Sequence, residues 1–435
     1  MIDIRVLREQ PEVVKAAAKH KNAAISSADI DRILELDTRR RELTTQTEQQ
    51  RQERNELSGG LKKGKPTAEQ IEAGKKLKAA LAKLEGEFVK VDAEYLALLK
   101  QVPNLPAADV PVGKTEDENV VAKTVGEPTQ FAFEPKNHWQ IGEAKGWIDK
   151  ERAAKVAGSR FAYLKGDLVR LHLALINFAL DVLTDEAVLE RIAADAGLAG
   201  KVSTKPFVPV LPPLMIRTEP YEAMDRLEPR DDRYKIEGEE LWLQGSAEHV
   251  LGSMHAGEIL PEADLPVRYA GYATSFRKEA GTYGKDMEGI LRMHQFDKLE
   301  LESITTAETS LDEHLFMIAI QEYLVSQLEL PYQVIMKCTA DIGKPNARGV
   351  DIDTWLPGQG KYRETHTADY MTDYQTRRLQ LRVRRTGGAV ELAHSNDATA
   401  LSMRPLIAII ENYQQEDGSV KVPKALVKYY GREFL

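Results

Sequence analysis

The sequence predicts an α+β protein in which a long antiparallel helical hairpin precedes an antiparallel β-sheet flanked by helices. Two helix-length stretches with apolar residues spaced three and four apart, near residues 30–57 and 67–98, surround a short Gly- and Lys-rich turn. Alternating apolar and polar residues on both sides of a glycine-containing loop, within 276–300, indicate two antiparallel strands. The length of 435 residues provides for two domains.

The composition is that of a soluble globular protein, with 42% apolar and 29% charged residues. No apolar run is long enough to cross a bilayer, and the start MIDIRVLREQ lacks the apolar core of a signal peptide. We therefore expect a cytoplasmic protein without a membrane partner. The single cysteine, Cys338, excludes an internal disulfide and a multi-cysteine zinc site.

Charge is distributed unevenly along the chain. The net charge is −9, yet residues 1–100 carry 20 Lys and Arg against 17 Asp and Glu, whereas the remainder carries 39 against 51. The N-terminal quarter is therefore the part that we expect to contact a nucleic acid.

The first hundred residues read as helices. Residues 1–20 are amphipathic, and we expect one helix that offers Ile4, Leu7, Val13 and Val14 to a core. A longer helix begins at about Ile30, after side chains at Ser26 to Asp29 that are suited to capping it. The residues expected to face the second helix are Ile33, Leu36, Arg40, Leu43, Thr47, Gln50, Arg54 and Leu57. Half of these eight residues are polar.

A second long helix follows the turn SGGLKKGKP, which occupies residues 58–66. It begins at about Thr67 and carries seven apolar residues in heptad spacing: Leu77, Leu81, Leu84, Phe88, Val91, Tyr95 and Leu98. So short a turn requires the two helices to run antiparallel, as a hairpin of about 45–50 Å at 1.5 Å per residue. The spacing alone leaves open a dimerisation coiled coil and an RNA-binding arm.

The domain boundary is expected after the hairpin, where Pro103, Pro106 and Pro111 precede an acidic run. We predict an arm at 1–105 with its hairpin at about 30–100, a linker at 106–135 and a larger domain at 136–435. In the larger domain, helical patterns lie at 153–156 and 168–183, and the apolar stretch FVPVLPPLM predicts a strand ending at Pro213. Residues 335–364 predict a strand, a polar loop and a second strand.

The segment FRKEAGTYGKDMEGILRMHQFDKLE, residues 276–300, contains the candidate residues for binding a phosphate and a base. Alternation along a strand predicts Arg277 and Glu279 on one face. The Arg277 guanidinium suits a phosphate or carboxylate, Glu279 suits an exocyclic amine, and Phe296 offers a ring for a base. A solvated charged hairpin is the alternative for this segment.

A second cation lies near the C-terminal end. Arg404 precedes Pro405, which suits the first turn of a helix, and Leu406, Ile409, Ile410 and Tyr413 mark the buried face of that helix. Its charge then adds to the positive end of the helix dipole and attracts a terminal phosphate.

These segments resemble the motifs of class II aminoacyl-tRNA synthetases, and seryl-tRNA synthetases in particular. Residues 276–300 are similar to motif 2, 168–213 to motif 1, and Arg404 with IIENYQQEDGSVKVPKAL to motif 3 and the C-terminal signature of that family. The opening DIRVLREQPEVV is also similar to the start of its bacterial members. The resemblance implies a class II synthetase sheet and a homodimer through motif 1.

Three shorter segments match the family pattern with departures. Ser246-Ala247-Glu248 stands where Thr-Ala-Glu is usual, and ETHTADYMTDYQTRR, from Glu364, aligns with ExSSCSNxxDFQxRR. Within it, His366 replaces a serine and Ala368-Asp369-Tyr370 replace Cys-Ser-Asn. Asn396-Asp397-Ala398-Thr399 replaces Asn-Gly-Ser-Gly, so Ala398 aligns with the substrate-contacting serine and Thr399 is the hydroxyl closest to it in sequence.

The resemblance implies that the chain activates serine with ATP and loads tRNA(Ser), with tRNA(Sec) as a further candidate acceptor. Arg277 and Arg404 are the implied catalytic residues, and Glu364 with Thr367 the implied Mg²⁺ ligands, because that ion prefers hard oxygen donors. The implied serine site comprises Ser246, Ala247, Glu248, Arg277, Glu300, Ala398 and Thr399. The implied ATP site comprises Arg277, Lys278, Glu279, Phe296, Glu364, Thr365, His366, Thr367 and Arg404.

In that family the helical arm grips the variable arm of the tRNA, which favours the RNA-binding interpretation of the hairpin. The candidate phosphate contacts are Arg40, Arg51, Arg54, Lys62, Lys63, Lys65, Lys75 and Lys76, together with Arg39 and Lys78. Two alternatives stay open: a synthetase-like paralogue that loads another acceptor, which typically lacks this arm, and a non-catalytic RNA-binding or coiled-coil protein.

Overall fold

The computed structural model describes residues 1–60, 67–279 and 289–435 and divides the chain into two compact units, Met1–Leu105 and Pro106–Leu435. Lys62, Lys63 and Lys65, named above, lie outside these ranges, as do residues 280–288 of the glycine-containing segment. None of the helices in the described ranges combines the length and apolar character that crossing a bilayer requires.

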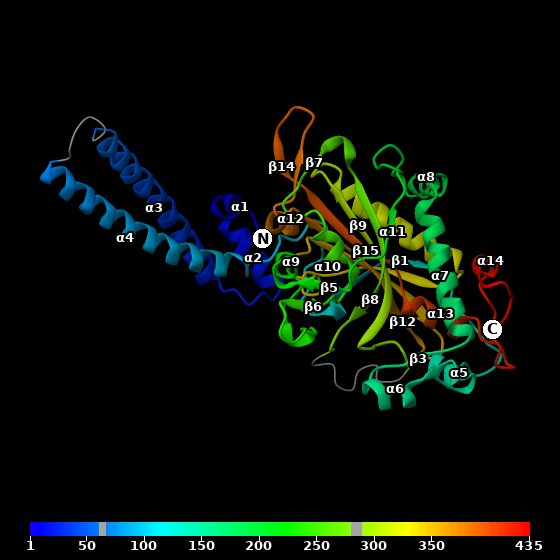
Figure 1. Cartoon of the computed structure of the whole chain (residues 1–435). Coiled ribbons are helices and arrows are strands. Elements are labelled where there is room, and N and C mark those ends of the chain that lie inside the picture. The colour runs from blue at the N-terminus through cyan, green and yellow to red at the C-terminus, as the bar shows by residue number, and fades with distance from the viewer. Residues whose placement is uncertain (61–66, 280–288) are drawn as a thin grey trace. The chain divides into compact units, whose positions relative to one another are not determined.

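The first unit is helical throughout its described elements (Figure 1). Its helices are α1 (Ile4–Glu9), α2 (Pro11–His20), α3 (Ser27–Gly60) and α4 (Ala68–Leu99). The single helix expected over residues 1–20 is wrong, because Pro11 opens a second helix and Gln10, at φ −136°, breaks the first. Of the expected core residues, Leu7 and Val14 are buried, whereas Val13 is 49% exposed.

The predicted antiparallel hairpin is present as α3 and α4, which lie side by side. Thr67 caps α4 through a capping box with Gln70, one residue before the helix begins. The seam is best buried near the base, where Ile33, Leu36 and Leu43 of α3 and Leu81 and Tyr95 of α4 are almost inaccessible. Heptad spacing therefore identified the packing face of this hairpin correctly.

Within the described residues of the second unit, the main sheet has eight strands, and every neighbouring pair except β4–β8 is antiparallel. Their order across the sheet is β1 (Val120–Val125), β10 (Tyr332–Met336), β11 (Arg348–Leu356), β12 (Lys361–Thr372), β15 (His394–Ser402), β9 (Gln295–Thr305), β8 (Val267–Phe276) and β4 (Val208–Val210).

Helices and short strands surround this sheet. The helices are α5 (His138–Ala144), α6 (Lys150–Ala157), α7 (Asp167–Thr184), α8 (Glu186–Asp195), α9 (Thr218–Ala223), α10 (Ala247–Gly252), α11 (Ser310–Gln327), α12 (Tyr374–Leu379), α13 (Met403–Asn412) and α14 (Val427–Tyr430). The short strands are β2 (Ile148–Asp149), β3 (Tyr163–Leu164), β5 (Met215–Arg217), β6 (Leu241–Leu243), β7 (Ile259–Pro261), β13 (Arg382–Arg384) and β14 (Val390–Leu392).

Several expected boundaries change. Residues 106–135, expected as a linker, include β1, which pairs with β10 at the edge of the sheet. Residues 335–364 contain parts of three strands, because β10 ends at Met336 and β11 lies between it and β12. The strand expected to end at Pro213 is β4, which ends at Val210. Helices are present at both predicted positions, as α6 and α7.

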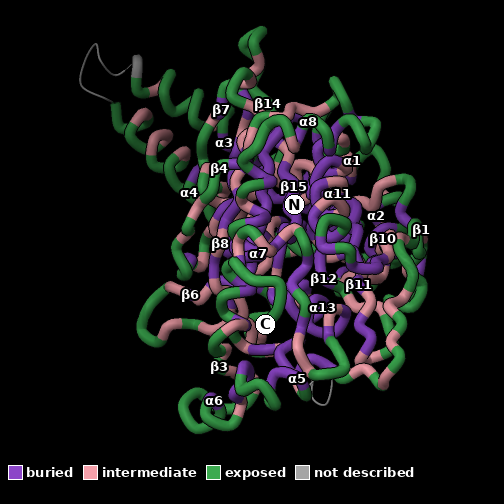
Figure 2. Tube along the Cα trace, turned by 90° about the vertical axis from the view of Figure 1, so that its right-hand side faces the viewer, coloured by how far each residue is buried: buried purple, intermediate pink, exposed green. Residues whose placement is uncertain are grey.

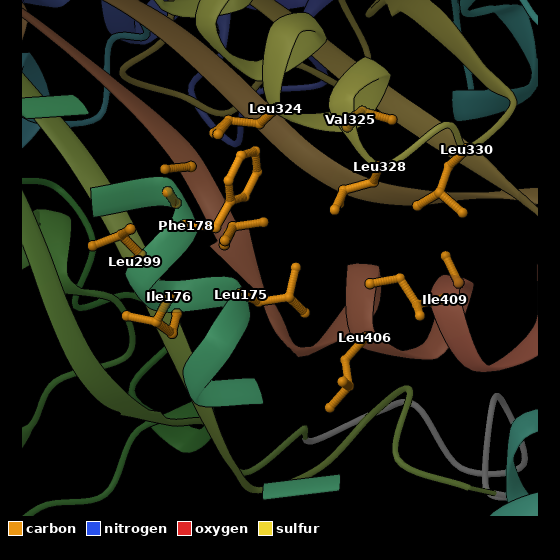
Figure 3. Close-up of a cluster of buried hydrophobic side chains, with 14 of the residues drawn as sticks. Leu175, Ile176, Phe178, Leu299, Leu324, Val325, Leu328, Leu330, Leu406 and Ile409 are labelled. Carbon is orange, nitrogen blue, oxygen red and sulfur yellow. The ribbon is translucent and has the colours of Figure 1, made fainter. Parts of the chain in front are cut away.

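The two faces of the sheet differ in polarity. Leu299 and Leu301 on β9, Ala398 on β15 and Ala368 on β12 belong to the large core, together with residues of α7, α11 and α13. Figure 3 shows Leu299 with labelled side chains of these three helices, and Figure 2 colours the whole chain by burial. Alternation along the same strands turns Glu300, Thr399 and Thr367 to the opposite face. The functional side chains therefore project from a sheet whose other face is anchored in a close-packed apolar layer.

Candidate active site

A cavity of about 650 Å³ lies on the polar face of the sheet, where β9 and β12 meet the first turn of α13. Eight residues of the predicted sites line it: Arg277, Glu279, Phe296, Glu364, Thr365, Thr367, Thr399 and Arg404. Its other lining residues include Asp231, Asp232, Arg292, Met293, Lys298 and Met403. The cavity therefore combines cations, carboxylates and hydroxyls with the apolar surface of Phe296 and the methionines.

Arg277 follows directly after β8. Its Nε donates to the carbonyl oxygen of Gly245 at 3.0 Å, and its guanidinium carbon lies 5.4 Å from the centroid of the Phe296 ring. The backbone of Arg277 continues the pairing of the two strands, because its N–H donates to the carbonyl of His294 at 3.0 Å. Both ends of this side chain are thus held in the cavity wall.

Arg404 belongs to the first turn of α13, where the Ser402 hydroxyl caps the helix by accepting from the Arg404 N–H at 3.2 Å. Its Nη1 donates to the carbonyl oxygen of Glu364 and lies 2.9 Å from Glu364 Oε1. Burial opposes ionisation of Glu364, but Arg404 and Lys337 outweigh it and lower the pKa of this carboxyl to about 2. Arg277 and Arg404, 127 positions apart in the chain, line the same cavity.

The predicted strand alternation of Arg277 and Glu279 is wrong, because β8 ends at Phe276. Glu279 adopts a left-handed backbone conformation, with φ +52°, and its Oε2 forms an ion pair with Arg292 Nη1 at 2.5 Å. Both residues nevertheless line the cavity, brought there by the loop rather than by the pleat of a strand. The second strand expected within residues 276–300 is β9, which begins only at Gln295.

Glu364 and Thr367 on β12 and Asp351 on β11 offer carboxylate and hydroxyl oxygens, the donor type that hard divalent cations prefer. Thr367 on β12 is the Cα partner of Asp351 on β11, so both side chains are on one face. Asp351 Oδ1 is buried and accepts no hydrogen bond from the described residues. Burial raises the pKa of Asp351 to about 7, although Lys337, at 3.5 Å, opposes that rise. Sequence reasoning missed Asp351, although its place opposite Thr367 follows once the strands pair.

Ser246, Glu248 and Glu300, which were predicted for the serine site, are buried and do not line this cavity. Lys298 connects these buried residues with the cavity. It lines the cavity, its ammonium lies 2.6 Å from Glu300 Oε2, and it donates to Ser246 Oγ at 3.3 Å. Burial raises the pKa of Glu300 to about 7 against the opposing charge of Lys298. Lys298 was not among the predicted residues, although its place two positions before Glu300 indicates a shared face.

Glu248, Glu300 and Asp397 each have one oxygen within 4.8 Å of the others. Glu248 forms an ion pair with Arg226 at 2.5 Å, and Glu300 with Lys298. Arginine and lysine therefore already balance two members of this acidic group.

Strand register decides which other predicted residues reach the site. Thr399 is opposite Glu300 and lines the cavity, whereas Ala398 is opposite Leu301 in the apolar core. His366 is opposite Ile352, is fully buried and does not line the cavity. Ala247 packs in a small cluster with Leu251 and Ala273, and the ammonium of Lys278 lies 5.5 Å from the centroid of the Tyr234 ring. Of the predicted ATP contacts, His366 and Lys278 are therefore not part of the cavity.

The basic residues of the arm have two kinds of environment. Arg39, Arg40 and Arg51 of α3 form ion pairs with Glu87, Asp92 and Glu85 of α4. Arg54, Lys75, Lys76 and Lys78 are exposed along the hairpin. Arg40 and Arg51, which were predicted to contact phosphate groups, therefore connect the two helices of the hairpin by ion pairs.

Comparisons with known proteins find relatives over the whole length of the chain. Residues 1–106 match the family model of the seryl-tRNA synthetase N-terminal domain, and 233–413 match that of the tRNA synthetase class II core domain (G, H, P, S and T). A serine--tRNA ligase of Symbiobacterium thermophilum is 39% identical, with 99% of this chain and 98% of that protein aligned. One of Nitrosopumilus maritimus is 37% identical, over 100% of this chain and 99% of the relative.

Solved structures agree with these matches. Seryl-tRNA synthetase from Pyrococcus horikoshii, crystallised with ATP, superposes with a TM-score of 0.89 at 38% identity, covering 100% of this chain and 99% of that one. The cytoplasmic serine-tRNA ligase of Naegleria fowleri, crystallised with AMP, gives 0.84 at 28% identity, covering 100% and 98%. The chain belongs to the seryl-tRNA synthetase family, with the class II catalytic core of that family and its N-terminal helical arm.

Proposed function

We propose that this chain activates L-serine with ATP to form seryl-adenylate and pyrophosphate, and then transfers the seryl group to the terminal ribose of tRNA(Ser). The observation that carries this proposal is that Arg277 and Arg404 line one cavity, beside carboxylate and hydroxyl oxygens. No protein nucleophile is needed, because the serine carboxylate attacks the α-phosphorus. The chain contributes alignment and charge neutralisation.

ATP binds in the cavity with its triphosphate between the two guanidinium groups. Arg277 holds the α-phosphate and the serine carboxylate, whereas Arg404, at the positive end of α13, holds the γ-phosphate. Phe296 stacks on the adenine, and Glu279 accepts from its amino group. Their common place in the cavity lining supports this arrangement.

Glu364 and Thr367 hold Mg²⁺, with Asp351 as the neighbouring oxygen donor. When bound, the ion would supply positive charge to the nucleotide phosphates. The unsatisfied oxygen of Asp351 supports the fit of a cation at this place.

Serine binds deeper, where Glu300 accepts from its hydroxyl and Glu248 from its ammonium group. Thr399 supplies a hydroxyl beside Glu300, because the two residues are partners across β15 and β9. A pocket committed to a hydrogen bond with the substrate hydroxyl rejects alanine strongly, since Glu300 would be left buried without that donor.

The arm binds tRNA through phosphate contacts of its exposed cations, of which Lys75 and Lys76 are the clearest within the described residues. A homodimer forms through the motif 1 region. Val208 of the edge strand β4 and Leu211, Leu214 and Met215 after it are all exposed, and Leu211 is 82% exposed. Apolar side chains beside an unpaired strand edge suit a second copy of the same surface.

Serine-dependent exchange of pyrophosphate into ATP, followed by charging of tRNA(Ser), tests the function. We expect both activities, with exchange at least about a hundredfold faster with serine than with alanine. Exchange without charging of tRNA(Ser) or tRNA(Sec) would instead support a paralogue with another acceptor. Absence of both, in protein that binds tRNA, would support a non-catalytic RNA-binding protein.

A further inference from the structure

Arg226 is a largely buried cation that none of the sequence motifs includes. It lies in the loop after α9, and only 17% of its side chain is exposed. Its Nε donates to Glu248 Oε1 at 2.5 Å, and its Nη2 lies 3.6 Å from Asp369 Oδ2 and 4.0 Å from Asp397 Oδ2. The same Nη2 donates to Asn346 Oδ1 at 3.4 Å. One guanidinium therefore faces three carboxyl groups from three different elements.

Sheet register explains why a cation is required at this position. Asp397 on β15 is the direct partner of Glu302 on β9 and of Asp369 on β12, so three carboxyl groups form a row on one face. Like charges directly opposite each other destabilise a sheet. Glu302 is almost fully buried, and its oxygens accept no hydrogen bond from the described residues. Arg226 is the ion-pair partner of two members of the row.

Arg226 also determines the state of Glu248, the first acidic residue of α10. Burial opposes ionisation of Glu248, but the charge of Arg226 outweighs it, and the pKa of Glu248 falls to about 2. Burial and the negative charges of Glu248 and Asp369 raise the pKa of Asp397 well above its usual value. Arg226 thus favours the ionised form of Glu248, whereas burial and the neighbouring carboxylates oppose ionisation of Asp397.

We propose that Arg226 is a positioning residue for recognition of the amino acid: it orients Glu248 and preserves its negative charge, so that this carboxylate receives the ammonium group of the substrate. The inference rests on the proposed function, in which Glu248 binds that ammonium. Asp369 and Asp397 stand where the family pattern has serine and glycine. These two acidic residues are therefore a feature of this chain, and so is the need for a buried cation beside them.

The test compares Arg226→Gln and Arg226→Lys with Arg230→Gln as a matched control. Arg230 forms similar ion pairs, with Glu222 at 2.5 Å and Glu228 at 2.9 Å, but 46% of its side chain is exposed. Pyrophosphate exchange with serine varied and then with ATP varied gives the two KM values. We expect Arg226→Gln to raise the KM for serine about tenfold or more, the effect of losing one charged contact. The KM for ATP should stay within about twofold.

Arg226→Lys retains the charge and should recover part of the serine affinity, whereas Arg230→Gln should match the parental protein. An unchanged KM for serine in Arg226→Gln would overturn the role of Arg226. Absence of serine-dependent exchange in the parental protein would instead overturn the proposed function, so the two failures are distinguishable.

A second variant separates positioning from simple charge balance. Asp397→Asn in the Arg226→Gln background removes one buried acid, and we expect it to restore thermal stability while the KM for serine stays high. Asp397→Asn alone provides the reference for both measurements. Recovery of both stability and serine affinity in the double variant would show that Arg226 acts only as a structural counter-ion and would contradict the proposal.

Discussion

We expect serine recognition to depend on pH through Glu300, because burial raises the pKa of this carboxyl to about 7. Below that pH the carboxyl is protonated and is a weaker acceptor for the substrate hydroxyl; above it, the carboxylate is available. We expect kcat/KM for serine to rise by up to about tenfold per pH unit below pH 7 and to level off above it. Bound serine stabilises the ionised form, so kcat should show this limb at lower pH. A profile that is flat from pH 5.5 to 8 would contradict this assignment.

Replacement of Glu300 tests the same contact without changing pH. Glu300→Ala removes the proposed acceptor of the serine hydroxyl, and we expect serine-dependent exchange to fall by at least about two orders of magnitude. The fold should be affected less than the activity: Lys298 loses its ion-pair partner at 2.6 Å, but it lines the cavity and still donates to Ser246, and the burial cost of the Glu300 carboxyl is removed as well. Pyrophosphate exchange and thermal unfolding measure the two effects, and exchange at the parental rate would refute the role of Glu300.

At the scale of elements, the α3–α4 hairpin separates cations that hold the arm together from cations that face solvent. Lys75 and Lys76 are exposed on α4, whereas Arg40 and Arg51 bridge to the facing helix. The double variant Lys75→Glu/Lys76→Glu should lower kcat/KM for tRNA about tenfold or more at low salt, because phosphate contacts supply much of the affinity.

Pyrophosphate exchange does not involve tRNA, so it should be unchanged in that double variant. Lys201→Glu, a charge reversal at an exposed residue of the second unit, provides the control. Loss of exchange together with charging would indicate damage to the fold instead of a tRNA contact. Parental charging, with an unaltered salt dependence, would exclude these two lysines from the RNA interface.

At the scale of the whole molecule, the exposed apolar residues near β4 determine the expected assembly. Leu211 is 82% and Met215 48% exposed, beside the edge strand of the eight-stranded sheet. The variant Leu211→Asp/Met215→Asp should convert a dimer into monomers by placing four like charges in a self-complementary interface. Analytical ultracentrifugation of the parental protein and the double variant measures their masses in solution. The same mass for the two proteins would contradict the proposed interface. Met254→Asp, at a residue 54% exposed elsewhere on the surface, should leave the dimer intact.

Local patterns were sufficient to predict the elements that bear the site. Heptad spacing identified the hairpin, and Pro405 with its apolar neighbours identified α13. The segment 276–300 was correctly predicted to connect two antiparallel strands, although alternation placed the ends of both strands too far into the loop. These signals are reliable because the residues that decide each element are neighbours in the chain. Residues 1–20 show where periodicity fails as a predictor. The amphipathic pattern continues through Pro11, but the helix is interrupted at Gln10 and a second helix begins at Pro11.

The sequence by itself determined the two-part organisation and the motifs that place the chain in its family, because both are carried by periodicity and by residues within short segments. Tertiary structure alone decided that Thr399 and not Ala398 faces the cavity, that His366 enters the core, and that Arg226 meets Glu248. Strand register turns every second side chain to one face, and burial makes the partner of each charge decisive. Both depend on segments far apart in the chain, so they emerge only when the strands pair and the core closes.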